Sequence, residues 1–281
     1  MKIISVDSLA FGGTGKTPMV LEIASILKSI GVKFSIVTRG YGSTSEKNGV
    51  SVNENHSWQE VGDEVKMISL EFPDIDIFTG CDRVNSLKKS EENGNKVVIL
   101  DDGFQSAGIK KDLKIMMINP DNRYYYLRNF KFLMCKEDVI LFYKYGKRNK
   151  RICRFTKEPD IGEYSFRFTS FQTPDGLPAD PENLPVFGFS ALGDNERFRS
   201  DLREKNLVGF RGFGDHYKYT KKDLQNLEKM MKSYGAEFLI CTYKDFIKIS
   251  DMIVDGFPLI YVKNKIKFNY DLKEKVLSIL K

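Results

Sequence analysis

The stretch Gly12-Gly13-Thr14-Gly15-Lys16-Thr17-Pro18 decides which fold this chain can adopt. It follows a short apolar run at residues 3–6 and precedes a segment, residues 19–27, in which apolar side chains recur at helical spacing. A glycine-rich turn between a strand and a helix suits a phosphate group, because several N–H groups can point into one concavity and the helix N-terminus adds positive charge. The stretch therefore predicts a nucleotide-binding turn, although Ala10 stands where the general pattern has a glycine. An ordinary glycine-rich turn without a ligand is the alternative.

Two side chains at the end of this turn fit the chemistry of a nucleotide site. A lysine at the position of Lys16 reaches the β- and γ-phosphates, and a hydroxyl at the position of Thr17 ligates Mg²⁺. We therefore expect nucleotide to contact a continuous set of residues, namely Gly12, Gly13, Thr14, Gly15, Lys16 and Thr17.

Two further strands carry polar residues at their carboxyl ends, where open parallel sheets bind ligands. Residues 32–37 form one predicted strand, which is followed by a loop containing Arg39 and Tyr41. Residues 96–100 form a continuous apolar strand, typical of a buried parallel position, which ends at Asp101 and Asp102. Acids at this place in a phosphate-binding fold are expected to hold a metal ion, the alternative being a solvated Asp-Gly turn.

Strands and helices alternate from residue 1 to about residue 148, which predicts an α/β fold with a doubly wound parallel sheet of the P-loop NTPase type. Polar and apolar residues then alternate over 151–173, and prolines follow. We therefore divide the chain into a nucleotide-binding lobe (1–148), a β-ribbon with a linker (149–184) and a smaller α/β lobe (185–281).

Composition excludes several other classes of protein. With 281 residues, of which 41% are hydrophobic, the chain can bury a sizeable core. Its four cysteines are scattered without a CxxC pair, which argues against a disulfide framework and fits a reducing compartment. Because no apolar run approaches bilayer length and the first residues already look like a core strand, we expect neither signal peptide nor transmembrane anchor. The net charge of +6 suits anionic substrates or lipid surfaces but gives no indication of nucleic-acid binding.

The sequence contains only two histidines, His56 and His216. His56 lies in a polar loop and is expected at the surface. His216 follows Asp215 in a glycine-flanked segment ahead of a helix, so it is either an acid–base element or a structural residue.

Taken together, these segments resemble the tetraacyldisaccharide 4′-kinase family, the lipid A 4′-kinases. In the first lobe the resemblance rests on GGTGKTP at 12–18, TRGYG at 38–42, VGDE at 61–64 and DDGFQ at 101–105. In the second lobe it rests on FGFSALG at 187–193, FGDHYKYT at 213–220 and CTYKD at 241–245, where Tyr243 replaces the family's glutamate. The likeness extends over nearly the whole chain.

The resemblance implies a kinase that moves the γ-phosphoryl group of ATP, with Mg²⁺, to the 4′-hydroxyl of a lipid-linked glucosamine disaccharide. It implies a base dyad of Asp63, which accepts the hydroxyl proton, and His216, which orients it. Glu64, Asp101 and Asp102 would serve the metal together with Thr17, while Arg39, Tyr41 and Gln105 would line the substrate side. The implied location is the cytoplasm or the cytoplasmic face of the inner membrane, without an obligate protein partner.

The chain departs from the family pattern on the side that faces lipid. It begins at the P-loop strand, where family members have a membrane-docking segment, and Ser106 replaces a histidine. Aromatic residues around Lys131 form either an interfacial patch or a packed surface beneath the β-ribbon, namely Tyr124, Tyr125, Tyr126, Phe130 and Phe132. Another sugar or glycolipid acceptor, or a nucleotide-binding switch without catalysis, remain the alternative functions.

Overall fold

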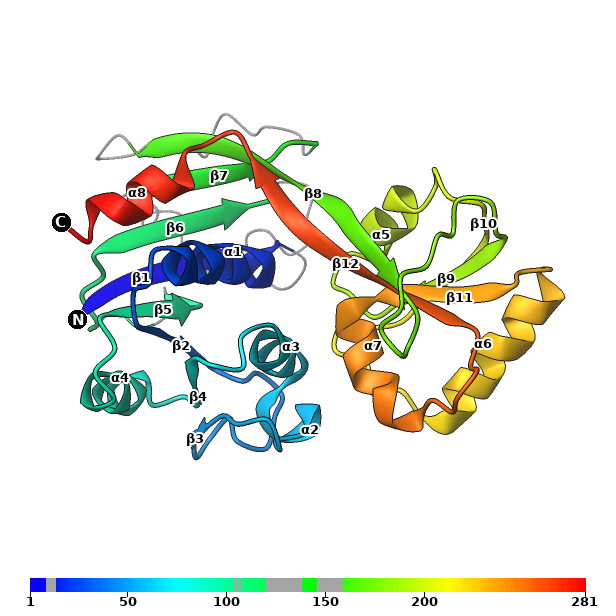
Figure 1. Cartoon of the computed structure of the whole chain (residues 1–281), viewed down its shortest axis with the longest axis horizontal. Helices are drawn as coiled ribbons and strands as arrows, with labels where there is room; N and C mark the ends of the chain where they lie inside the picture. Colours follow the sequence, from blue (N-terminus) through cyan, green and yellow to red (C-terminus); the bar gives the residue numbers. More distant parts are fainter. Residues whose placement is uncertain (9–13, 104–105, 107, 120–137, 146–158) are drawn as a thin grey trace. The chain divides into compact units, whose positions relative to one another are not determined.

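The structure is a computed structural model that describes residues 1–8, 14–103, 106, 108–119, 138–145 and 159–281. The chain divides into two compact units (Figure 1). Unit 1 comprises Met1–Phe166 and Ile266–Lys281, and unit 2 comprises Arg167–Lys265.

Unit 1 is built on a parallel sheet with the strand order β7-β6-β1-β5-β2-β4. A short strand, β3, joins the β4 edge in the antiparallel direction. The strands are β1 (Lys2–Ser8), β2 (Phe34–Thr38), β3 (Val50–Ser51), β4 (Asp76–Thr79), β5 (Val97–Asp101), β6 (Leu113–Ile118) and β7 (Val139–Tyr143). β1 and β5 are central and buried on both faces, which explains their unbroken apolar runs.

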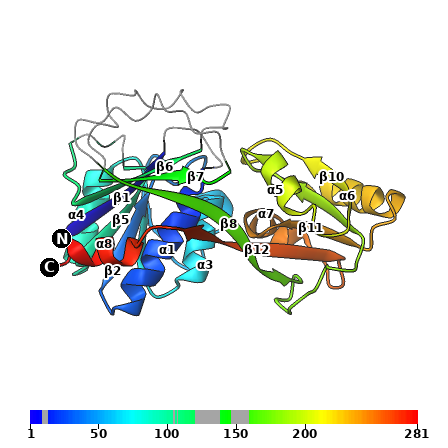
Figure 2. The ribbon, with the colours of Figure 1, turned by 90° about the horizontal axis from the view of Figure 1, so that it is seen from above.

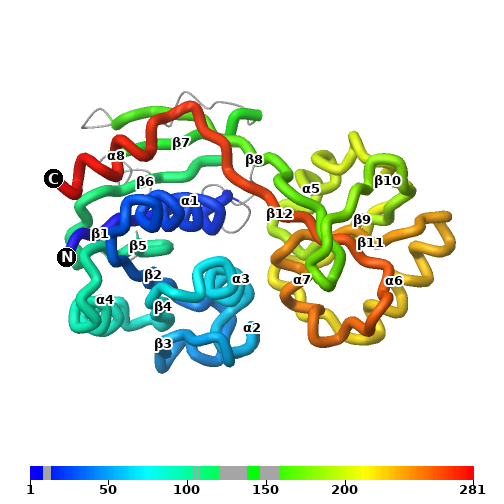
Figure 3. Tube along the Cα trace, in the orientation of Figure 1, coloured from blue at the N-terminus to red at the C-terminus, as the bar shows by residue number. Residues whose placement is uncertain are grey.

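Helices cover both faces of this sheet, as Figures 2 and 3 show. Alternate strand residues such as Ile4 and Ile99 pack with the helices of one face, α1 (Lys16–Ser29), α3 (Asp63–Glu71) and α8 (Leu272–Ser278). The intervening residues Ile3 and Val98 pack with α4 (Arg83–Glu92) on the other face. A short helix, α2 (Trp58–Val61), precedes α3. This arrangement is the doubly wound sheet of the P-loop type that the sequence predicts, and it confirms the fold class.

Unit 2 contains four neighbouring strands of the same 12-stranded sheet, which are parallel and have the order β10-β9-β11-β12. Its strands are β9 (Val186–Ser190), β10 (Leu207–Gly212), β11 (Phe238–Thr242) and β12 (Leu259–Phe268). One face packs against α6 (Lys221–Ser233) and α7 (Tyr243–Ile249), and the other packs against α5 (Asn195–Asp201). A 3₁₀ turn, Ser250–Met252, follows α7.

Two long strands run from one unit into the other. β8 (Asp160–Gln172) pairs with β7 through its first residues and is the sheet neighbour of β12. The sequence analysis predicts that both strands of the β-ribbon lie within residues 149–184. In the structure only β8 lies there, and the strand beside it is β12, which comes from residues 259–268. The predicted second lobe, 185–281, also differs from the structure, because Ile266–Lys281 returns to unit 1, where Leu272 and Val276 join the core. Sequence order alone does not reveal such a return.

Candidate functional site

The glycine-rich turn lies where predicted, between β1 and α1. Gly15 has a φ of 89° and directly precedes the helix, whose first residues are Lys16 and Thr17. The Lys16 Nζ donates a hydrogen bond to Ser8 Oγ at 3.2 Å, which holds the ammonium group close to the end of β1. Gly12 and Gly13 lie outside the described residues. The described part of the turn thus places Lys16 and Thr17 at the start of α1, and phosphate binding there stays a prediction.

Two residues of the strand β8 contact this turn. Tyr164 is buried and its hydroxyl donates to the carbonyl oxygen of Thr14 at 2.6 Å. A Cβ atom on Gly15 would collide with the ring of Phe166, two residues further along β8. The turn is therefore shaped by contacts from a distant strand as well as by its own glycines, and no local sequence pattern indicates these contacts.

Replacing Gly15 with alanine is expected to weaken ATP binding by at least about tenfold, because the new methyl group forces either the turn or Phe166 to move. Titration of the variant with ATP would measure this. The matched control is Gly31→Ala at the other end of α1, where φ is also positive, at 69°, but no atom lies within 4 Å of the added Cβ. An equal loss of ATP affinity in both variants would show that backbone strain, and not the contact with Phe166, is responsible.

Asp101 is the central acid at the carboxyl edge of the sheet. Its Oδ2 accepts a hydrogen bond from Thr38 Oγ1 at 3.0 Å, and the carboxylate is buried. Burial raises the pKa of Asp101, and the nearby charge of Glu64 raises it further, while Lys16 opposes this shift. The structure thus brings together three of the predicted site residues, Lys16, Glu64 and Asp101.

Arg83, which the sequence analysis left unassigned, also belongs to this edge. It starts α4 directly after β4, is buried, and donates from Nη2 to the carbonyl oxygen of Asp101 at 3.1 Å. Burial lowers the pKa of Arg83, and the charge of Asp101 counteracts this. A single arginine at a helix start matches no sequence motif. The only feature of the sequence that could have indicated a role at the site is its position after the end of a predicted strand.

Three buried polar atoms at this edge find no hydrogen-bond partner among the described residues: Thr14 Oγ1, Asp101 Oδ1 and Arg83 Nη1. Buried polar groups are nearly always paired, so such a cluster calls for a ligand or ordered water. An acceptor and two donors match a nucleotide phosphate with its cation, since phosphate oxygens accept hydrogen bonds and a carboxylate oxygen binds a cation.

The described residues contain no ready-made cluster of three acidic, histidine or cysteine ligands for a metal. Mg²⁺ does not require one, because it keeps several waters and usually takes one or two protein oxygens together with substrate phosphates. The unpaired Asp101 Oδ1 and the hydroxyl of Thr17, at the buried start of α1, fit that pattern.

Asp63 and Glu64 form the first turn of α3. Asp63 is buried, and its Oδ1 accepts the N–H of Glu64 at 2.8 Å. Gly62, with a φ of 99°, begins this helix without a side-chain cap, so neither acid serves as its N-cap. Asp102 follows β5 with a φ of 60°, a strained value for a residue other than glycine.

The resemblance assigns Arg39, Tyr41 and Gln105 to the substrate side of the site, and the structure describes two of them. Arg39 pairs with Glu46 through a 2.7 Å contact between Nε and Oε1, and Tyr41 is 65% exposed. Arg39 also lies close enough to Arg83 for its charge to lower the pKa of Arg83. Gln105 and the aromatic residues around Lys131 lie outside the described residues.

His216 belongs to unit 2, in the segment between β10 and α6. It has a φ of 54°, its backbone N–H donates to Asp215 Oδ1 at 3.1 Å, and its side chain is 33% exposed. The ring Nε2 lies 3.9 Å from the same Asp215 oxygen. His216 is thus a partly exposed imidazole beside an acid, on a backbone held in an unusual conformation.

Comparison with known proteins gives one consistent result. The sequence model of the family described as tetraacyldisaccharide-1-P 4′-kinase (LpxK) matches residues 1–281. The tetraacyldisaccharide 4′-kinase of Desulfotalea psychrophila is 31% identical over 98% of this chain and 86% of its own length. That of Rickettsia canadensis is also 31% identical, over 89% of this chain and 77% of its own.

A solved structure agrees with the sequence comparisons. The crystal structure of LpxK from Aquifex aeolicus in complex with ATP is similar with a TM-score of 0.75 and 25% sequence identity. The match covers 100% of this chain and 89% of that chain. The family model, the curated relatives and the solved structure all agree. We conclude that this chain belongs to the tetraacyldisaccharide-1-P 4′-kinase family of ATP-dependent kinases.

Proposed function

We propose that the chain transfers the γ-phosphoryl group of ATP to the 4′-hydroxyl of a tetraacyl glucosamine disaccharide 1-phosphate, with the carboxyl edge of the unit 1 sheet as its nucleotide site. The observation that carries this assignment is the set of three unpaired buried polar atoms on Thr14, Asp101 and Arg83 at that edge. A nucleotide phosphate with its cation would pair all three.

In this proposal Lys16 neutralises charge on the β- and γ-phosphates, and the backbone of the turn at 12–15 donates to their oxygens. Thr17 and Asp101 would hold Mg²⁺, with Glu64 and Asp102 serving its bound water. The ion would neutralise charge on the phosphates. Phosphoryl transfer depends mainly on positioning and charge neutralisation, so this chain's task is to fix the phosphate group in line with the attacking oxygen.

Asp63 is proposed as the base and His216 as the residue that orients it. The sugar oxygen forms a bond to the γ-phosphorus while the bond from that phosphorus to the β,γ-bridging oxygen breaks, so ADP leaves with the electron pair. The hydroxyl proton passes to the Asp63 carboxylate. The position of Asp63 supports this role because its carboxylate is buried in the first turn of α3, where its Oδ1 is oriented by the N–H of Glu64. Arg39, Tyr41 and Gln105 are proposed to contact the acceptor.

We place the reaction on the cytoplasmic side of the inner membrane, with the enzyme associated peripherally. None of the helices in the described part of the chain has the length and apolar character needed to cross a bilayer. The acyl chains of the proposed acceptor are the reason to expect membrane contact.

The experiment that tests the function is transfer of label from γ-labelled ATP, with Mg²⁺, to tetraacyldisaccharide 1-phosphate in detergent micelles. Labelled product is expected with this acceptor and is not expected with a free glucosamine disaccharide that lacks acyl chains. Equal transfer to both acceptors would contradict a lipid acceptor, and binding of Mg²⁺-ATP without any transfer would contradict the proposal as a whole.

Arg83 offers a separate test of the nucleotide site. Replacing Arg83 with lysine keeps the charge but removes the planar fork that donates to Asp101, so kcat/KM for ATP is expected to fall by about tenfold or more. The control is the reverse exchange, Lys88→Arg, on the exposed face of the same helix. Steady-state kinetics with varied ATP would measure both. Unchanged kcat/KM in Arg83→Lys would show that the guanidinium contributes only to packing.

A further inference from the structure

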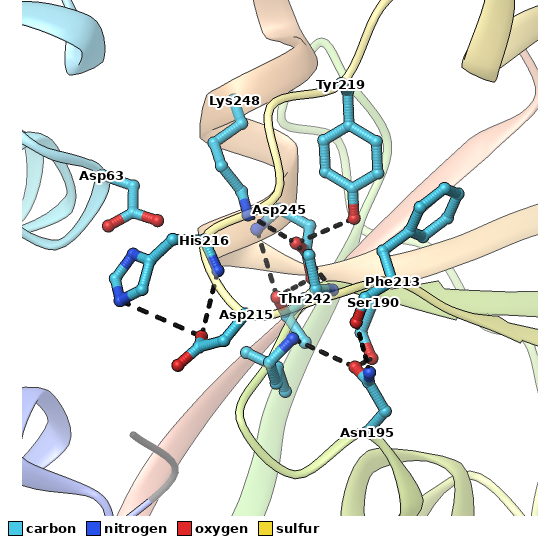
Figure 4. A network of polar contacts seen from close by, with 12 residues as sticks. Asp63, Ser190, Asn195, Phe213, Asp215, His216, Tyr219, Thr242, Asp245 and Lys248 are labelled. Carbon is cyan, nitrogen blue, oxygen red and sulfur yellow. Dashed lines mark hydrogen bonds and ion pairs between the residues drawn. The ribbon is translucent and has the colours of Figure 1, made fainter. Parts of the chain in front are cut away.

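A buried carboxylate, Asp245, organises the polar interior of unit 2. It lies in the first turn of α7 with no exposed side-chain surface. Its Oδ1 accepts hydrogen bonds from the backbone N–H of Ala191 at 3.1 Å and from the hydroxyl of Tyr219 at 3.0 Å, and it lies 3.0 Å from Lys248 Nζ. Its Oδ2 accepts from Thr242 Oγ1 at 2.7 Å (Figure 4). A carboxylate with this many donors has one fixed orientation.

Tyr219 connects this carboxylate to the segment that carries His216. Burial, strengthened by the charge of Asp245, raises the pKa of Tyr219 far above its ordinary value, so its hydroxyl keeps its proton and donates. The Lys248 ammonium lies 5.2 Å from the centre of its ring, which adds a cation–π contact. The ring also packs against Phe213 and Tyr217, with centroids 5.1 and 5.4 Å away. Tyr219 therefore anchors the C-terminal end of the segment Phe213–Tyr219.

Asn195 anchors the other end of the same segment. Its Oδ1 accepts from Ser190 Oγ at 2.6 Å and from the N–H of Leu192 at 3.0 Å, which fixes the orientation of the amide group. Nδ2 donates to the carbonyl oxygen of Phe213 at 2.6 Å, and the N–H of Phe213 donates back to the carbonyl oxygen of Ser190 at 2.8 Å. Figure 4 shows these contacts beside the Asp245 cluster.

The two anchors enclose the residue whose backbone is strained. His216, with its φ of 54°, lies midway between Phe213 and Tyr219. A residue other than glycine keeps such a conformation only where its surroundings over-determine it. Hydrogen bonds at both ends of a seven-residue segment supply that constraint.

We propose that Asn195 and Asp245, the latter acting through the Tyr219 hydroxyl, are positioning residues that fix both ends of the Phe213–Tyr219 segment and thereby set the place of the His216 imidazole. The consequence for phosphate transfer rests on the role proposed above for His216. The positioning itself can be measured without any assay of activity.

The first test observes His216 directly. Because the chain contains only two histidines, the imidazole Cε1–H region of a ¹H–¹³C spectrum has two signals, which the variant His56→Gln would assign. Tyr219→Phe removes only the anchoring hydroxyl and leaves the ring in place. It is expected to shift or broaden the His216 signal while the His56 signal stays unchanged. Tyr234→Phe, at an exposed tyrosine of the same unit, is the matched control and should move neither signal.

The second test uses kinetics in two backgrounds. Tyr219→Phe is expected to lower kcat by between about 5- and 100-fold, with KM for ATP unchanged, because a small displacement of a catalytic group is costly. In a His216→Ala background the same substitution should change kcat by less than about twofold, since residues that act as a unit are not additive. Asn195→Asp, which keeps the acceptor oxygen but removes the donor to Phe213, should behave in the same way, with Asn226→Ala on the exposed face of α6 as its control.

The outcomes separate the two claims. An unmoved His216 signal in both Tyr219→Phe and Asn195→Asp would overturn the positioning role. An equal fall in kcat in both backgrounds would overturn it as well, because the substitutions would then act through general structure. A moved signal together with full activity of His216→Ala would support the positioning but refute the proposed role of His216 in the reaction.

Discussion

Replacing Lys16 with alanine is expected to lower kcat/KM for ATP by about a thousandfold or more, because the variant loses the ammonium group that we propose neutralises the transferring phosphate. Lys16 begins α1 directly after Gly15, and its Nζ is held toward β1 by Ser8 at 3.2 Å. The group is thus positioned before nucleotide binds, which is the condition under which a charge contributes most to catalysis.

Transfer of label from γ-labelled ATP measures this effect. The matched control is Lys28→Ala in the last turn of the same helix, where the ammonium forms an exposed 3.4 Å pair with Asp74 and lies 5.7 Å from the centre of the Phe72 ring. Exposed pairs of this kind contribute little to stability, so the control should retain its activity and its fold. If Lys16→Ala transferred phosphate at the rate of the unchanged protein, the assignment of the nucleotide site to this turn would be wrong.

Replacing Asp63 with asparagine is expected to lower kcat by about 10²- to 10⁴-fold, the range over which a general base contributes, while ATP binding changes little. Asparagine has nearly the same shape and still accepts the Glu64 N–H through its side-chain oxygen, so the start of α3 should be preserved. The substitution removes the negative charge and, with it, the capacity to accept a proton.

Single-turnover transfer together with a separate ATP titration distinguishes a loss of chemistry from a loss of binding. Asp74→Asn, at an exposed acid shortly after the end of α3, is the control. A fall in ATP affinity that matched the fall in kcat would assign Asp63 to the nucleotide. If the proposed dyad is correct, adding His216→Ala to Asp63→Asn should have far less effect than His216→Ala alone.

The grouping of Lys16, Glu64 and Asp101 at the carboxyl edge of the unit 1 sheet was largely predictable because its determinants are local. A glycine at positive φ, a lysine in the first helical turn and an acid at the end of a buried strand each have a signature within a few residues. Arg83 was not predictable in this way, since its relation to Asp101 depends on β4 and β5 ending at the same edge of the sheet. The same limit applies to Tyr164 and Phe166, which reach the turn at Thr14 and Gly15 from a strand far along the chain.

In the second lobe the helices and strands are predictable from the sequence, but the central polar residue is not. Its strands and helices follow from apolar periodicity, and its capping residues are visible, as in the Thr220–Asp223 capping box at the start of α6. The central place of Asp245 was not visible, because a buried acid in the first turn of α7 looks like an ordinary helix-start residue in the sequence. Its partners come from segments separated by up to 54 positions, such as Ala191.

The discontinuous composition of unit 1 has a consequence for how the protein is made. Ile266–Lys281 completes the core of unit 1, yet the ribosome synthesises it only after all of unit 2. Unit 2 is a continuous segment and can fold as soon as it has emerged, whereas unit 1 must wait with part of its apolar surface uncovered. We therefore expect a released chain that ends before Ile266 to have a folded second unit and a first unit that is sensitive to protease and dependent on chaperones.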